Sequence, residues 1–423
     1  MRIGIIGGGG AGLATAWLLN DHHQVTLFEK ETRLGGHADT VYVDVDGQQV
    51  GIDAGFEFFS PAMFPVFIRL LGLLNVPLDD FELTYSFYTT DGRRTTVLPP
   101  WRDGRLVWGS LTPPQLVDLL QFQFVLTRAA QLNERRDPRL TITEYLNSLP
   151  LTPGFKDNFI KPFLLASWCV PMRDFEAFTA YNVLRYSFKH LAGGLKPFIW
   201  KEIAGGTQTY IQALAKTLDR TTLRLGSVIT GLTYADGLYT VREATGQVHQ
   251  FDHLVLATNA NQASALLKDI PQVEDVRALL DRVEYFETTI AVHGDERLMP
   301  ADKKAWSVVN TRYDGTYSSY TIYKPWKTPQ RPIFKSWITY EDHLPDKLYA
   351  VTRYWHGKVN AAYFATQQAL PAYQGRNNLW LAGLYTHDVD CHESAVLSGV
   401  NVARQIAPES ARLKQLLGPD ALP

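Results

Sequence analysis

Residues 2–36 read RIGIIGGGGAGLATAWLLNDHHQVTLFEKETRLGG, and this stretch decides the fold. The apolar run at 2–6 is typical of a buried parallel strand, and residues 24–28 predict a second one. Between them, a glycine-rich turn at 7–12 leads into residues 12–20, whose apolar spacing is helical. A strand, turn, helix and strand in this order predict an α/β fold built on a parallel sheet.

The glycines of the turn follow the spacing Gly7-x-Gly9-x-x-Gly12, the fingerprint of a dinucleotide-binding site. The first glycine permits the tight turn, the second lets the backbone approach a pyrophosphate, and the third lets the helix pack on the strand. Glu29 ends the second strand, where a carboxylate accepts hydrogen bonds from a ribose diol. The alternative is a glycine-rich turn that binds no ligand.

A second motif begins at that carboxylate, Glu29-x-x-x-Arg33-x-Gly35-Gly36. It resembles the motif that follows the fingerprint in the flavin amine oxidase superfamily, which also holds carotenoid desaturases, protoporphyrinogen oxidase and a bacterial polyenoic fatty acid isomerase. The resemblance implies that the cofactor is FAD, with its isoalloxazine ring between an FAD domain and a substrate domain. For Arg33 the alternative is a solvated surface charge.

Other segments extend the resemblance over most of the chain. Ile52–Glu57 (IDAGFE) is similar to the segment that these enzymes place against the flavin ring, and Gly205-Gly206-Thr207 resembles their re-entry into the FAD domain. Leu225–Ile229 matches the strand whose backbone amide, here Val228, would meet the adenine. The helix from Glu393 resembles the last motif, whose N–H groups face the pyrimidine edge of the flavin. The residues assigned to the cofactor in this way are Gly7, Gly9, Gly10, Ala11, Gly12, Glu29, Lys30, Arg33, Gly35, Gly36, His37, Gly55, Phe56, Val228, Gly383, Asp388 and Glu393.

Residues 40–54 alternate and turn at Asp46-Gly47, which predicts a hairpin, and residues 84–108 predict short strands with Asp-Gly turns at 91–92 and 103–104. The dinucleotide-type pieces lie at the start, the middle and the end of the chain, with helical and aromatic stretches between them. We therefore expect an α/β fold in which a Rossmann-type FAD-binding domain is interleaved with an α+β substrate domain, as in amine oxidase-like two-domain flavoproteins. The predicted FAD domain is discontinuous, at 1–60, 204–262 and 376–410. The predicted substrate domain spans 61–203 and 263–375, with a helical part near 113–190.

Several positions depart from the amine oxidase pattern. His37 stands where these enzymes usually carry an arginine, and the strand that often supplies a lysine near flavin N5 reads Thr288-Thr289-Ile290. Their last motif commonly reads Gly-x-Glu, whereas this chain has Gly383-Leu384-Tyr385. Cys391 does not match the spacing of the cysteine that carries covalent flavin in some relatives. These departures bear on the reaction rather than on FAD binding, to which backbone amides contribute much.

The tentative catalytic residues are His37 and Glu57, with flavin N5 as the main reactive centre. For His37, a hydrogen bond to the cofactor or a base near neutral pH stands against a structural histidine. For Glu57, a buried base or cation-binding carboxylate stands against a salt bridge to a nearby Lys or Arg. Phe56 and Phe58 are the tentative substrate contacts, with core packing as the alternative. Lys324 and Lys335, in an aromatic strand-rich region, can reach the pocket or lie exposed.

The segment Thr386-His387-Asp388-Val389-Asp390-Cys391-His392-Glu393 holds metal-ligating residue types, but it lacks a second ligand set with the usual spacing. We therefore predict no metal. In the resemblance, this segment is the loop and helix start over the flavin, where Asp388 would hydrogen-bond a ribityl hydroxyl.

Composition excludes some partners. The chain of 423 residues has 41 basic and 43 acidic side chains and a formal net charge of -2, which gives no electrostatic footprint for nucleic acid. Its apolar runs are too short for a membrane span, the first strand leaves no room for a signal peptide, and the two cysteines fit a reducing compartment. We expect a cytoplasmic protein without an integral membrane segment.

The expected activity is that of an FAD-dependent oxidoreductase. Aromatic residues make up 12% of the chain, which suits either a filled core or a pocket for an apolar ligand. The leading hypothesis is removal of a hydride from a C–H bond of a mostly apolar substrate to flavin N5, with dioxygen or another acceptor reoxidising the flavin. The alternatives are redox-neutral isomerisation of a fatty acid double bond and oxidation of an amine intermediate. A flavin-binding protein without catalysis is a fourth hypothesis.

Overall fold

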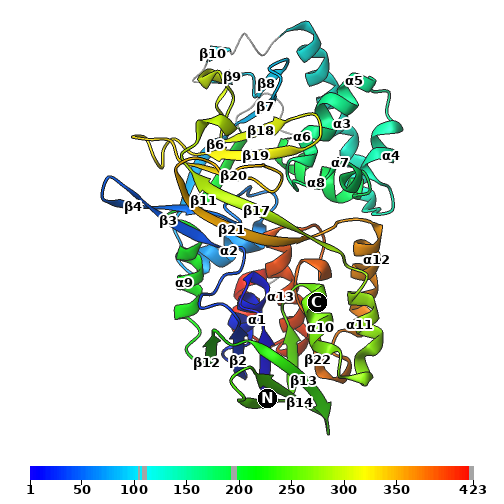
Figure 1. Ribbon diagram of the computed structural model, residues 1–423. Helices are drawn as coiled ribbons and strands as arrows, with labels where there is room; N and C mark the ends of the chain where they lie inside the picture. The colour runs from blue at the N-terminus through cyan, green and yellow to red at the C-terminus, as the bar shows by residue number, and fades with distance from the viewer. Residues whose placement is uncertain (103–104, 107–111, 192–197, 419–423) are drawn as a thin grey trace.

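The computed structural model describes residues 1–102, 105–106, 112–191 and 198–418 (Figure 1). Its lower half in Figure 1 is built on a five-stranded sheet in which every neighbouring pair is parallel. The strand order is β12 (Thr221–Leu225), β2 (Gln24–Glu29), β1 (Arg2–Ile6), β16 (His253–Leu256) and β22 (Leu379–Leu381). These strands come from the start, the middle and the end of the chain, so the predicted Rossmann-type sheet is confirmed.

Helix α1 (Gly10–Leu19) follows the glycine-rich turn and is buried along nearly its whole length. It approaches strand β1 very closely, because a Cβ atom at Gly12 would lie 1.9 Å from the Gly7 carbonyl oxygen. Helix α13 (His392–Ile406) packs against α1, and a Cβ atom at Gly399 would lie 2.8 Å from the Ala11 carbonyl oxygen. The third glycine of the fingerprint thus serves helix packing, as the sequence predicts.

The described chain also forms smaller antiparallel units. One contains β13 (Ile229–Ala235), β14 (Leu238–Glu243) and β15 (Val248–Phe251). The second is the predicted hairpin of β3 (Thr40–Val45) and β4 (Gln48–Asp53), which turns at Asp46-Gly47. The third unit pairs β5 (Phe58–Phe59), β11 (Phe198–Ile203) and β6 (Leu78–Leu83).

The upper half of Figure 1 holds a seven-stranded sheet with the order β21-β17-β20-β19-β18-β7-β8. Its strands are β21 (Leu348–Gly357), β17 (Tyr285–His293), β20 (Phe334–Trp337), β19 (Ser318–Tyr323), β18 (Val309–Tyr313), β7 (Tyr85–Thr89) and β8 (Thr95–Leu98). The hairpin β3–β4 packs Val43 and Val45 against Val292 and Ile333 of this region. Strand β21 was not predicted from the sequence, and it forms an edge with many exposed side chains, which weakens the hydrophobic alternation.

Helices α3 to α8 lie beside the seven-stranded sheet, within the range expected to be helical (Figure 1). They are α3 (Pro113–Arg135), α4 (Ile142–Asn147), α5 (Pro153–Phe155), α6 (Lys161–Leu165), α7 (Met172–Phe175) and α8 (Ala180–Leu191). The remaining α-helices are α2 (Pro65–Leu73), α9 (Gln208–Lys216), α10 (Ala260–Leu267), α11 (Glu274–Leu280), α12 (Ala361–Ala369) and α14 (Ala411–Leu417). Short strands β9 (Trp101–Arg102) and β10 (Arg105–Leu106) also form, whereas the turn expected at 103–104 lies outside the described residues.

The predicted domain boundary at 262/263 falls inside helix α10. Helices α10, α11 and α12 lie beside the parallel sheet in the lower half of Figure 1. The sequence, in contrast, places residues 263–375, which include α11 and α12, in the substrate domain. The chain therefore crosses between the two halves several times. The remaining predicted boundaries stay predictions.

The close contact at Gly12 generates a stability prediction. We expect Gly12→Ala to lower the free energy of unfolding by about 1–3 kcal/mol, because the added methyl group would overlap the Gly7 carbonyl. The matched control is Gly72→Ala in helix α2, where a Cβ atom would have no neighbour within 4 Å. That substitution should be neutral or slightly stabilising. Chemical denaturation of both variants measures the difference, and equal stabilities would contradict the packing role of Gly12.

Candidate active site

The turn before α1 forms a cradle of backbone. Gly9 is the residue that precedes the first turn of α1, and a Cβ atom built on it would have no protein atom within 4 Å. Gly35 and Gly36 run beside it, with the Gly35 amide donating to the Gly8 carbonyl at 2.9 Å. The first turn of α1 contains no acidic side chain, so its N–H groups and positive dipole end are available to an anion.

The predicted ribose carboxylate also shapes the cradle. Glu29 Oε2 accepts the Gly8 amide at 2.7 Å, and Oε1 accepts the Glu31 amide at 2.9 Å. Each oxygen keeps capacity for a further hydrogen bond. Arg33 pairs with Asp39 at 2.9 Å and donates to the Gly36 carbonyl at 3.1 Å, so it holds the glycine pair in place.

Four other residues that the sequence assigns to the cofactor do not line the cradle, and the structure gives each of them its own surroundings. Lys30 is exposed, and Val228 has an exposed side chain and a carbonyl that accepts the Ala244 amide at 2.8 Å. Asp388 is engaged by Arg185 at 2.8 Å and by the Tyr181 hydroxyl at 2.6 Å. Gly383 donates its amide to Ser398 Oγ at 2.8 Å. Their contacts with the cofactor stay predictions.

Glu393 reaches across to a second helix. Its carboxylate accepts the amides of Val66 at 2.9 Å and Phe67 at 2.8 Å, in the first turn of α2. A carboxylate at a helix N-terminus is favourable, and here it ties the start of α13 to the start of α2.

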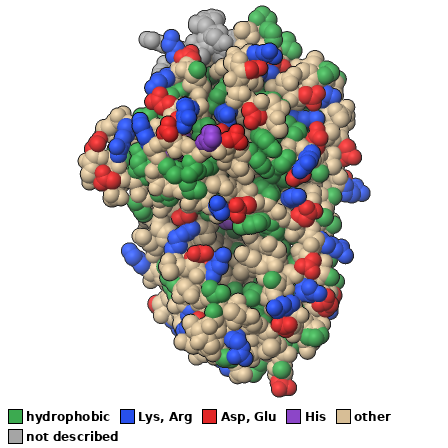
Figure 2. Space-filling model, viewed as in Figure 1, with side chains coloured by type: hydrophobic (Ala, Val, Ile, Leu, Met, Phe, Trp, Pro, Cys, Tyr) green, Lys and Arg blue, Asp and Glu red, His purple; other side chains and the backbone are tan. Residues whose placement is uncertain are grey.

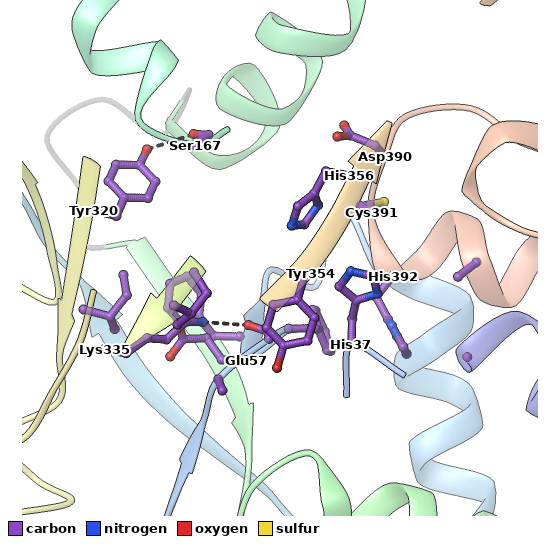
Figure 3. A pocket seen from close by; sticks show the side chains of 18 of the residues that line it. His37, Glu57, Ser167, Tyr320, Lys335, Tyr354, His356, Asp390, Cys391 and His392 are labelled. Atoms are coloured by element: carbon purple, nitrogen blue, oxygen red, sulfur yellow. Dashed lines mark hydrogen bonds and ion pairs between the residues drawn. The ribbon is translucent and has the colours of Figure 1, made fainter. Parts of the chain in front are cut away.

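A cavity of about 320 Å³ extends from the cradle toward the seven-stranded sheet (Figure 3). One face of that sheet lines it, through residues two apart on the same strands: Tyr320 and Ile322 on β19, Lys335 and Trp337 on β20, Tyr354 and His356 on β21, with single residues Tyr85, Val309 and Ile290 from β7, β18 and β17. The other walls are Gly9, Gly10, Gly35, Gly36, His37, Ala54–Phe58, Phe64, Ser167, Trp168, Trp200, Leu384, Asp390–His392 and Ala395. The predicted ring-facing segment and both tentative catalytic residues therefore line one cavity.

The two predicted phenylalanines differ in their surroundings. Phe56 stacks on His392, with ring centroids 4.4 Å apart, and it also contacts a buried aromatic group. Phe58 meets Trp200 edge-on at 5.4 Å. Both rings combine core packing with a surface toward the cavity.

Glu57 is held in a buried ion network. Its carboxylate pairs with Lys335 Nζ at 2.8 Å and Lys324 Nζ at 2.9 Å, and Lys324 also pairs with Glu202 at 2.8 Å. Burial alone would raise the pKa of Glu57, but the two ammonium groups outweigh it and lower the pKa. A carboxylate saturated in this way is a poor proton acceptor, so the contacts favour the salt-bridge alternative over catalysis by Glu57.

Lys335 lies on strand β20, next to β17, which carries the Thr288-Thr289-Ile290 stretch. The side chain is buried, and its ammonium group donates to the Gly55 carbonyl at 2.6 Å and to Glu57 at 2.8 Å. An ammonium group has three N–H donors, so Lys335 retains one for a ligand in the cavity. Strand β17, where amine oxidases often carry a lysine, has none at Thr288-Thr289-Ile290, whereas Lys335 on the neighbouring strand β20 lines the cavity.

Three neutral histidines line the cavity near the cradle. His37 stacks on Tyr354 at 4.9 Å and lies 5.2 Å from His356, and His392 shares a hydrogen bond with the Tyr210 hydroxyl at 2.8 Å. Burial lowers the pKa of His37 to about 4 and those of His356 and His392 to about 3. His37 Nε2 is buried and has no hydrogen-bond partner in the protein, so it is free to bond to a cofactor.

Cradle and cavity together fit FAD. The open space over Gly9 suits a pyrophosphate, Glu29 suits a ribose, and the partnerless His37 Nε2 supplies a further polar contact. In the described part of the chain, no group of His, Cys, Asp and Glu could hold a metal ion. Among the helices of the same residues, none combines the length and the hydropathy of a membrane span.

The sequence profile of flavin containing amine oxidoreductases matches residues 11–347. The chain belongs to this family. The flavoenzyme therefore binds FAD and acts as an FAD-dependent oxidoreductase. Comparison with curated protein sequences finds no match.

Solved structures share the fold. The flavoenzyme is 16% identical to a CLA-producing fatty acid isomerase from P. acnes, with a TM-score of 0.68 over 95% of this chain and 98% of that chain. It is 16% identical to cyclohexylamine oxidase from Brevibacterium oxydans IH-35A, with a TM-score of 0.67 over 96% and 99%. A putrescine oxidase bound to putrescine is 14% identical, with a TM-score of 0.67 over 97% and 100%. These similarities confirm the amine oxidase-like fold that the sequence predicts.

Sequence reasoning missed several cavity residues of the flavoenzyme. Tyr354 and His356 lie on the unpredicted strand β21, and Trp168 and Ser167 follow helix α6. The alternation in residues 320–322, 335–337 and 354–356 marks residues that share a strand face, and this signal was available. It could not reveal which face meets the cofactor cradle.

The open space over Gly9 predicts that a larger side chain there weakens FAD binding without destabilising the apoprotein. Gly9→Val should leave the apoprotein about as stable as the wild-type apoprotein, because a Cβ atom at Gly9 would have no protein atom within 4 Å. The side chain would occupy the space assigned to the pyrophosphate, so FAD content should fall at least about tenfold. Flavin absorbance of the purified protein measures this loss. A fully yellow Gly9→Val protein would show that the phosphates lie elsewhere.

The buried histidines predict acid sensitivity. Their pKa values in the folded protein lie below the ordinary value near 6.5, so the unfolded chain takes up more protons as the pH falls below that value. Stability should therefore fall between about pH 7 and about pH 5, by about 1–2 kcal/mol for each histidine. His356→Gln should reduce this loss by one histidine's share, whereas His343→Gln, at an exposed site, should leave it unchanged. Denaturation at both pH values tests this, and equal losses in all three proteins would refute it.

Proposed function

We propose that the flavoenzyme removes a hydride from a C–H bond of a mostly apolar organic substrate. The observation that carries this proposal is the aromatic cavity continuous with the glycine cradle. Ring side chains from both halves of the molecule line it, so a substrate there contacts π faces and aliphatic groups over most of its surface. Bound FAD supplies the hydride acceptor.

The protein's part in this reaction is to orient the substrate and exclude water. Trp337, Tyr320 and Ile322 project from adjacent strands of a rigid sheet, which fixes the shape of the cavity. Glu57 and the Gly55 carbonyl hold the Lys335 ammonium group at the ring-facing segment. A buried positive charge there stabilises negative charge that develops during hydride transfer.

Surface charge agrees with a small-molecule substrate. On the face in Figure 2, basic and acidic side chains are interspersed without a large field of one sign. The proposed partners are therefore an apolar small molecule and an electron acceptor, either dioxygen or another oxidant. A cytoplasmic location is part of the same proposal.

Anaerobic flavin reduction tests the proposed reaction. The oxidised protein is mixed with fatty acids, polyenes, and aliphatic and aromatic amines, and the flavin absorbance near its long-wavelength band is followed. Bleaching by one class identifies the hydride donor. If no compound bleaches the flavin while double bonds migrate in a fatty acid, the reaction is redox-neutral isomerisation, and net hydride removal is refuted.

The ammonium group of Lys335 generates a rate prediction. Lys335→Met should slow flavin reduction by about tenfold to hundredfold, because a preorganised charge is lost from the cavity. The matched control is Lys303→Met. Lys303 pairs with Glu296 at 2.8 Å and lies 4.8 Å from the centre of the Trp306 ring. Lys335 lies at the same two distances from Glu57 and from the Trp337 ring. The two lysines differ in that Lys303 lies at the surface. Stopped-flow reduction compares them, and an unchanged rate in Lys335→Met would remove Lys335 from the mechanism.

A further inference from the structure

The cavity wall carries a carboxylate that the proposed reaction does not use. Among the described residues that line the cavity, Glu57, Lys335 and Asp390 carry formal charges, because the histidines are neutral. Glu57 and Lys335 pair with each other at 2.8 Å. Among the described residues, Asp390 forms no ion pair with a lysine or arginine, so no basic side chain pairs with its charge at the cavity wall.

Asp390 is held in place by neutral donors. Trp168 Nε1 donates to its Oδ2 at 3.0 Å, and Asn182 Nδ2 donates to its Oδ1 at 2.8 Å. The Asp390 amide also donates to Asn182 Oδ1 at 3.2 Å. The carboxylate is therefore oriented from two sides, while each oxygen keeps capacity for another hydrogen bond.

The neighbouring acid has a different arrangement. Asp388 pairs with Arg185 at 2.8 Å and does not line the cavity. The local arginine is therefore directed to Asp388, and Asp390 is left with neutral partners. Burial raises the pKa of Asp390 to about 6, although the bonds from Asn182 and Trp168 oppose this. The group is mostly ionised at neutral pH, yet a positive partner would stabilise it.

Figure 3 places Asp390 near Cys391 and His356, on the opposite side of the view from the Glu57–Lys335 pair. Trp168, which orients Asp390, also lines the cavity with its ring. A carboxylate beside aromatic faces is the environment that attracts a cation, through charge and through cation–π contact. The same charge disfavours a carboxylate-bearing ligand.

We propose that Asp390 is a specificity-determining residue that binds the cationic head group of an otherwise apolar substrate and excludes substrates with a carboxylate head. This inference rests on the proposed function and narrows its substrate class. It assigns the apolar body of the substrate to the aromatic wall and the head group to the Asp390 side of the cavity.

Binding to the oxidised holoenzyme tests the inference without turnover. The probes are benzyltrimethylammonium, which is a cation without an oxidisable N–H group, its neutral carbon isostere neopentylbenzene, and the anion phenylacetate. Perturbation of the flavin absorbance reports binding. Wild type should bind the cation at least about tenfold more tightly than the isostere, and phenylacetate more weakly than either.

Variants then assign the preference to one carboxylate. Asp390→Asn should reduce the preference for the cation to within about twofold, and Asp390→Glu should retain it because the charge is kept. The control is Asp314→Asn, since Asp314 also accepts two hydrogen bonds but is exposed and lies outside the cavity. Flavin content and unfolding midpoints verify that each variant is folded.

Three results would overturn the inference: tighter binding of phenylacetate than of the cation, no binding of the cation to wild type, or an unchanged preference in Asp390→Asn. The first two come from wild type alone, so a misfolded variant cannot leave the question open. If the cation binds through Asp390 and yet no compound in the anaerobic panel reduces the flavin, the proposed reaction fails while the head-group assignment stands.

Discussion

The contact between Gly12 and the Gly7 carbonyl sets the position of helix α1 on strand β1, and the cofactor cradle depends on it. A helix that approaches a strand this closely directs its free N–H groups to the end of the strand, over Gly9. Glu29 and the Gly35-Gly36 pair bond to the same turn and fix its shape. Helix α13 then packs on α1, and its first residue, His392, lines the cavity together with the preceding Cys391.

The second constraint is the pairing of buried charges at the cavity wall. Lys335, Glu57, Lys324 and Glu202 form a buried chain of alternating charges, and Lys327 also pairs with Glu202. Removal of Glu57 would leave Lys335 without its carboxylate partner. Such a network fixes the lysine next to the ring-facing segment. Asp390 lies outside this network and is oriented by the neutral donors of Trp168 and Asn182.

Local sequence patterns predicted much of the lower half of the molecule. The first strand, the helix after the turn and the second strand were each found within a few residues of their bounds, because glycine spacing and apolar periodicity act over short distances. The hairpin at 40–53 followed from alternation and from Asp46-Gly47. Strand β21 was not predicted because the hydrophobic alternation of an exposed edge strand is weak. The cavity residues Tyr354 and His356 lie on this strand, so they were missed as well.

The sequence by itself determined the cofactor class and the parallel sheet that binds it, since a backbone cradle needs only glycines at fixed spacing before a helix. It also indicated that Glu57, Phe56 and His37 belong near the cofactor. Only the tertiary structure decided their partners. Lys335 reaches Glu57 across 278 positions of sequence, and Asn182 reaches Asp390 across 208. Strand order and helix packing set such distances, and no local pattern encodes them, so these polar groups come together only when the two halves of the chain fold together.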